Sequence, residues 1–117
     1  MFTIAETAPF QNKIGTLLSD EERTDLIRYL AEHPSAGVII QGTGGIRKLR
    51  WACKGYGKSG GIRVIYYFHN ETMPVYLLAA FGKNEKANIS AKEKHLLAKL
   101  VRELIEYWRK RNEQGIH

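Results

Sequence analysis

Residues 41–70 form a segment with six basic side chains and no acidic one, namely Arg47, Lys48, Arg50, Lys54, Lys58 and Arg63. Fixed cations of this kind can hold a phosphodiester backbone. RNA also carries its own nucleophile, the ribose 2′-hydroxyl. Arginines and lysines that bind the scissile phosphate, stabilise the transition state and protonate the leaving 5′-oxygen could therefore cleave RNA without a metal. The segment indicates a site for a polyanion.

Other chemistries have less support. The four histidines, His33, His69, His95 and His117, do not have the spacing of metal ligands, and the basic segment has no carboxylates for a magnesium-dependent nuclease, so we expect no metal or other cofactor. Gly57-Lys58-Ser59 resembles the end of a phosphate loop, but Ala52 replaces its first glycine, and a β-branched run follows where a helix is required. Cys53 has cationic neighbours that could lower its pKa, but it has no evident base partner, and we interpret it as structural.

Length and composition predict one compact domain over residues 1–117. The chain is 44% hydrophobic and 26% charged, has a net charge of +6 and contains a single cysteine. These values are typical of a globular protein from a reducing cytoplasm. No apolar run approaches membrane-spanning length, so we expect a soluble cytoplasmic protein with no membrane partner.

The first part of the chain predicts a short strand and two helices. Residues 2–5 alternate between apolar and small or polar side chains, as a strand does. A helix is expected over residues 9–18. A second one begins after Ser19, which has a capping-box partner in Glu22, and ends at Pro34.

Three strands and a long helix are predicted next, over residues 46–52, 62–69 and 75–81 and from Ser90 onward. The helix carries an apolar stripe that we expect to pack against the sheet or a partner chain. The fold class is therefore α+β, with an N-terminal strand and two helices, an antiparallel strand meander and a long C-terminal helix.

This order of elements brings cations together. If residues 46–52 and 62–69 pair antiparallel, Arg50 and Arg63 project near the same end of the sheet. Lys54 and Lys58 then lie in the connecting loop, and Lys83 arrives at the end of a neighbouring strand.

Aromatic side chains near these cations could stack on an RNA base. Tyr67, Tyr56 and Trp51 are the candidates. Core packing is the favoured interpretation for Trp51 and Tyr66, whereas both roles stay open for Tyr67.

The runs "QGTGGIRKLRWACKGYGKSGGIRVIYYF" and "VYLLAAFGKNEKANIS" closely resemble the HigB-like branch of the RelE toxin superfamily, over roughly residues 1–110. The resemblance implies a RelE-like fold and an endoribonuclease that cuts mRNA, generally in the ribosomal A site, by metal-free 2′-hydroxyl attack. It also implies silencing by a cognate antitoxin, expected to be of the helix-turn-helix type, with operator DNA contacted only through that antitoxin.

The resemblance also assigns residues. Arg63 matches the strand arginine of the family's G-x-R-x-x-Y segment and is expected to bind the scissile phosphate, with Lys83 and Arg50 assisting. RNA-binding roles are expected for Lys48, Lys54, Lys58, Tyr67 and Asn84. The segment "NEKANIS" has neither the tyrosine nor the histidine that relatives carry there. The general acid and base are therefore unassigned, with Lys83, Lys54 and Lys58 as candidates if their pKa values are lowered.

Two alternatives to a nuclease stay open. The chain could grip RNA or the ribosome without cutting, or its basic face could only dock an acidic partner. The first predicts salt-sensitive binding of intact RNA, and the second predicts no RNA affinity in the partner-free chain.

Overall fold

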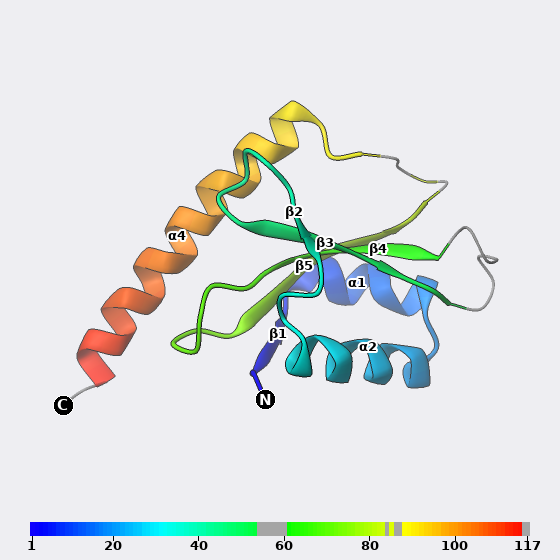
Figure 1. Cartoon of the computed structure of the whole chain (residues 1–117), viewed down its shortest axis with the longest axis horizontal. Helices are drawn as coiled ribbons and strands as arrows, with labels where there is room; N and C mark the ends of the chain where they lie inside the picture. The colour runs from blue at the N-terminus through cyan, green and yellow to red at the C-terminus, as the bar shows by residue number, and fades with distance from the viewer. Residues whose placement is uncertain (54–60, 84, 86–87, 116–117) are drawn as a thin grey trace.

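The computed structural model of the protein describes residues 1–53, 61–83, 85 and 88–115. Its elements are β1 (Ile4–Glu6), α1 (Ala8–Leu17), α2 (Asp20–Glu32), β2 (Val38–Ile39), β3 (Ile46–Trp51), β4 (Ile62–Tyr67), β5 (Val75–Gly82) and α4 (Ala91–Gly115) (Figure 1). The predicted α+β class is confirmed, and so is the predicted order of its helices and main strands.

The five strands form one mixed sheet in the order β1-β5-β4-β3-β2. Strands β3, β4 and β5 are the predicted antiparallel meander, and β1 is added parallel to β5. The edge strand β2 pairs antiparallel with β3 and was not predicted. It is only two residues long, with both side chains exposed, so no alternation marks it in the sequence.

Helices α1 and α2 cover one face of the sheet (Figure 1). The predicted capping box of α2 is present, because the Ser19 hydroxyl accepts from the Glu22 N–H at 3.1 Å and the Glu22 carboxylate accepts from the Ser19 N–H at 3.0 Å. Apolar side chains from both helices pack on every second strand residue, which include Leu49, Val64 and Tyr66. The strand residues between these, among them Arg50 and Arg63, therefore face the other side of the sheet.

Helix α4 lies on that other face (Figure 1). Val101 is its buried anchor, while the rest of its apolar stripe is partly buried against the sheet, and Leu96 is exposed. Farther along, the Trp108 indole N–H donates to the Tyr76 hydroxyl at 2.7 Å. The predicted packing of the stripe against the sheet is therefore confirmed. No helix in the described part of the chain combines the length and the apolar character needed to cross a membrane.

Candidate nucleic-acid interface

Arg50 and Arg63 lie directly opposite each other on β3 and β4. Their sequence neighbours Leu49 and Val64 are also paired and point into the core beneath α1 and α2. Because side chains alternate along a strand, both arginines project toward the α4 side of the sheet. The predicted convergence of these two residues is confirmed by the register.

A hollow of about 430 Å³ opens beside this pair and is lined by Ala36, Val38, Lys48, Leu49, Arg50 and Arg63. We call it the basic hollow. Lys48 pairs with Val38 on β2 and with Ile65 on β4. It therefore lies two residues before Arg50 on the same face of the sheet and faces the basic hollow. Three of the described lining residues are cations and none is an acid. The hollow can therefore hold an anion.

The side chains of the two arginines differ in conformational freedom. Arg63 is only 9% exposed, and one of its Nη atoms donates to the backbone carbonyl of Ile62 at 3.4 Å. Arg50 is exposed on the outer part of the same row. A buried guanidinium loses little entropy when it binds, because its orientation is already restricted, whereas an exposed one can adapt. Arg63 is thus suited to position a phosphate and Arg50 to close on it.

The segment that contains the lining residue Ala36 is anchored by Arg47 and Tyr66. Both side chains face the side of the sheet opposite to Arg50 and Arg63. Arg47 Nη1 donates to the carbonyls of Ser35 and Gly37 at 3.1 and 2.7 Å. The Tyr66 hydroxyl accepts from the Gly37 N–H and donates to the Pro34 carbonyl, both at 2.8 Å. These bonds anchor residues 34–37, which lead into β2.

Gly37 is required at this anchor. A Cβ built on it would lie 2.9 Å from the Tyr66 ring and 3.0 Å from the Lys48 carbonyl oxygen. Sequence reasoning missed the wall residues Ala36 and Val38. The β-branched run Val38-Ile39-Ile40 was the signal that could have indicated a strand there.

Lys83 follows the end of β5 and is exposed. The register pairs Arg63 with Phe81, so Lys83 lies two residues farther along, about 7 Å in an extended strand. The structure therefore brings Lys83 to the same end of the sheet as Arg63, on the neighbouring strand, but it is not among the described residues that line the basic hollow.

The turn after β5 is fixed by Glu85. Its carboxylate accepts from the Gly82 N–H at 3.1 Å and pairs with Lys13 of α1 at 2.6 Å. The Lys13 ammonium and the Gly82 N–H hold the pKa of Glu85 below its usual value. The Glu85 carboxylate thus stabilises the end of β5, which Lys83 directly follows.

The side chain of Tyr67 is buried, so it does not lie where it could stack on an RNA base. It is 3% exposed within the cluster beneath α4, and its hydroxyl is 3.1 Å from His69 Nδ1. Burial raises the pKa of that hydroxyl. Its ring has no free face for a base, which argues against the predicted stacking role. The core interpretation of Trp51 and Tyr66 agrees with the structure, because both pack in the cluster beneath α1 and α2.

The pKa of the Cys53 thiol is not set by its cationic sequence neighbours. Those neighbours could have lowered it, but burial and the Glu22 carboxylate raise the pKa of this thiol. Cys53 packs against the core beneath α1 and α2. Its interpretation as a structural residue is supported.

Several site predictions lie outside the described residues, namely those for Lys54, Tyr56, Lys58 and Asn84. The strand predicted after the glycines is β4, so the helix that a phosphate loop requires at that point is absent from residues 62–67. Across the part of the chain that the structure describes, no three His, Cys, Asp or Glu side chains are grouped so that they could hold a metal ion.

A family model described as "RelE toxin of RelE / RelB toxin-antitoxin system" matches residues 19–116. The chain belongs to the RelE toxin family. RelE-family toxins are generally ribosome-dependent endoribonucleases, and membership implies a cognate antitoxin. The matched range contains every described residue that lines the basic hollow.

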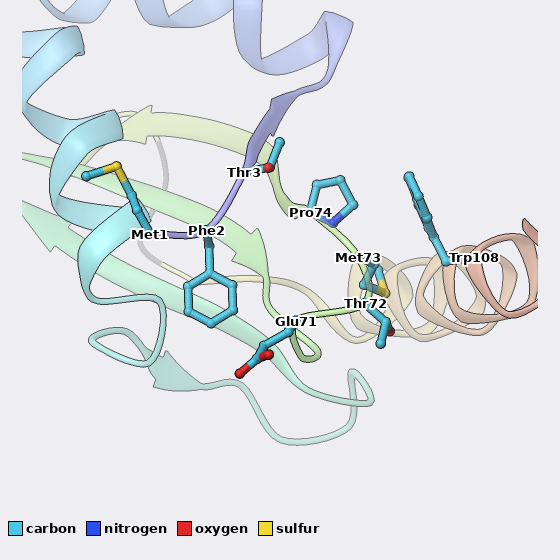
Figure 2. Close-up of a pocket in the computed structure, with 8 residues that line it drawn as sticks. All are labelled: Met1, Phe2, Thr3, Glu71, Thr72, Met73, Pro74 and Trp108. Carbon is cyan, nitrogen blue, oxygen red and sulfur yellow. The ribbon is translucent and has the colours of Figure 1, made fainter. Parts of the chain in front are cut away.

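A further hollow of this RelE-family chain shows how charge distinguishes the sites. It measures about 540 Å³ and lies between the start of β1, the β4–β5 turn and α4 (Figure 2). Glu71 has the one charged side chain among its described lining residues, which also include Phe2 and Trp108. A carboxylate repels phosphate, so this hollow is not suited to RNA.

Proposed function

We propose that this RelE-family chain is a HigB-like, ribosome-dependent mRNA endoribonuclease that acts in the cytoplasm. The observation that carries the proposal is the cross-strand pair of Arg50 and Arg63 in a hollow with no acidic lining residue among those described. Two guanidinium groups on adjacent strands can each donate paired N–H groups to the non-bridging oxygens of one phosphate.

The cleavage step uses the substrate's own 2′-hydroxyl. Its oxygen bonds to phosphorus, the bond from phosphorus to the 5′-oxygen breaks, and the products are a 2′,3′-cyclic phosphate and a 5′-hydroxyl end. The pentacovalent transition state carries one more negative charge than the phosphodiester, so the two arginines bind it more tightly than the substrate.

Proton transfer completes the step. In this proposal Lys83, at the same end of the sheet as Arg63, donates a proton to the leaving 5′-oxygen. The ribosome supplies the base that accepts the proton of the 2′-hydroxyl, which explains a dependence on the ribosome. Lys48 holds the backbone beside the scissile phosphate. A helix-turn-helix antitoxin silences the toxin and links it to operator DNA.

The test is controlled expression in a bacterium, with growth and mRNA 5′-hydroxyl ends measured together. Wild type should arrest growth and create new ends within codons. We expect Arg63→Ala to lower cleavage by about 10²- to 10³-fold, as loss of a transition-state donor does. Arg28→Ala, an exposed arginine on α2, is the matched control and should behave as wild type.

Two results would contradict the proposal in different ways. Equal cleavage by wild type and Arg63→Ala would remove Arg63 from the mechanism. Growth arrest by wild type without new 5′ ends would instead identify a module that blocks translation by binding RNA or the ribosome.

A further inference from the structure

A second hollow adjoins the basic hollow. It measures about 220 Å³ and is lined by Val38, Ile39, Ile40, Lys48, Asn88, Ile89 and Lys94. We call it the Lys94 hollow. Val38 and Lys48 line both hollows, so the two are neighbours at the edge of the sheet. A ligand longer than one phosphate could therefore extend from one to the other.

The lining of the Lys94 hollow is suited to a nucleotide. Lys48 and Lys94 supply two ammonium groups, Asn88 supplies an amide, and none of the described lining residues is acidic. Ile40 and Ile89 form an apolar floor, because both pack against the cluster beneath α4. Ammonium groups bind phosphate, and an apolar surface accepts the face of a base or sugar.

Lys94 lies beside the loop between β2 and β3. A Cβ built on Gly42 would lie 4.0 Å from Lys94 Cδ, so the lysine stem runs beside this loop. The same loop touches α4 again, because a Cβ on Gly44 would lie 3.5 Å from Val101 Cγ1. Both glycines have positive φ values, 82° and 77°, which other residues rarely adopt.

The loop is itself braced from within. The Thr43 hydroxyl, fully buried, donates to the Ile40 carbonyl at 2.6 Å and accepts from the Ile46 N–H at 3.0 Å. Lys94 therefore lies beside an internally hydrogen-bonded loop, although it lies on a different element from the other cations of the interface. Its half-buried state agrees with this placement.

We propose that the Lys94 hollow is a second RNA subsite, which binds the nucleotide adjacent to the one whose phosphate lies between Arg50 and Arg63. Lys94 and Lys48 bind the flanking phosphate, and the floor of Ile40 and Ile89 supports its base or sugar. This inference rests on the proposed function. Lys94 acts here by positioning the substrate and does not touch the reacting atoms.

The experiment measures binding of purified chain to fluorescein-labelled 2′-O-methyl oligoribonucleotides, which lack the attacking hydroxyl and stay intact. Lengths of two to six nucleotides are extended separately at the 5′ and 3′ ends. Wild type should gain about fivefold in affinity at one added nucleotide in one of the two series, as an ammonium reaches a new phosphate. Lys94→Ala should lose that gain, and its salt slope should fall by about 0.7. Lys94→Arg should retain the gain.

Lys92→Ala is the matched control. It removes the same charge from the same end of α4, and Lys92 is exposed and is not among the described lining residues. It should keep the length-dependent gain. Absence of the gain in wild type, or equal behaviour of Lys94→Ala and Lys92→Ala, would overturn the second subsite.

A third variant separates this failure from failure of the proposed function. Arg63→Ala should weaken binding at every length, including the shortest. If it does so while Lys94→Ala matches Lys92→Ala, the second subsite is wrong and the proposed function stands. Unchanged binding by Arg63→Ala at all lengths would count against both.

Discussion

Neutralising Arg50 should stabilise the folded protein while weakening its activity. Arg50 and Arg63 are direct antiparallel partners, so their Cα atoms are about 4.5–5.5 Å apart. The Arg50 side chain makes no hydrogen bond or ion pair with another described residue. Like charges directly opposite each other destabilise a sheet, and an RNA phosphate between them would relieve that repulsion.

The expected size follows from this geometry. A cross-strand charge pair changes stability by about 0.2–1 kcal/mol, and the exposure of Arg50 places this pair near the middle of that range. Arg50→Gln keeps much of the aliphatic stem and removes the charge. We expect it to raise the free energy of unfolding by about 0.5 kcal/mol, which corresponds to a Tm increase of about 2 °C.

Arg47→Gln is the matched control on the same strand, and its effect should have the opposite sign. Arg47 donates to two backbone carbonyls that hold the segment before β2. Hydrogen bonds from a charged donor contribute about 1.5–3 kcal/mol, so losing them should lower the free energy of unfolding by about 2 kcal/mol. Both variants make the same chemical change three residues apart.

Urea unfolding of both variants at low and high salt tests the reasoning. At about 1 M salt the Debye length is near 3 Å, so the gain of Arg50→Gln should largely disappear, while the loss of Arg47→Gln should persist. A lower stability of Arg50→Gln than of wild type at low salt would refute the predicted repulsion. An equal gain in stability at both salt concentrations would refute it as well.

Two further predictions concern the framework of the site. Tyr66→Phe should lower the free energy of unfolding by about 1–3 kcal/mol in urea, because it leaves the buried Gly37 N–H without its acceptor; an unchanged midpoint would show that water replaces the hydroxyl. The folded-state pKa of Glu85 lies below its ordinary value of 4.5, so its contribution is present at neutral pH and is lost as the pH falls through the folded-state pKa. Urea midpoints at pH 7 and pH 4 should therefore differ less in Lys13→Met, which removes the main cause of the lowered pKa, than in wild type; an equal difference would contradict this linkage.

The antiparallel meander could be predicted from the sequence because it depends on local alternation, whereas its exact register became known only from the structure. Once residues 46–52 and 62–69 were predicted to be paired strands, the side-chain period of two placed Arg50 and Arg63 on one face. The capping box of Ser19 and Glu22 likewise involves residues only three apart. Features of this kind need no knowledge of the tertiary contacts.

Features that depend on distant contacts were predicted less well. Alternation places Tyr67 on the face of Arg63, but whether its ring is free depends on α4, whose Val101 belongs to the same cluster. Cys53 has cationic neighbours in the chain, yet burial and the Glu22 carboxylate on α2 raise the pKa of its thiol. Lys94 is similar, because the packing of α4 against the sheet brings it to the same hollow as Lys48.

The pleat of β3 also changes how the basic segment should be interpreted. Its charge suggested a single polyanion site, yet Arg47 faces away from Lys48 and Arg50 and serves the backbone of residues 34–37. A count of cations therefore overestimates the charge of the site unless the residues of each strand face are counted separately. The two faces also differ in what a substitution does, since a change at Arg47 alters how much protein is folded. A change at Lys48 or Arg50 mainly alters what the folded protein binds, and only the second kind of variant tests the proposed RNA site.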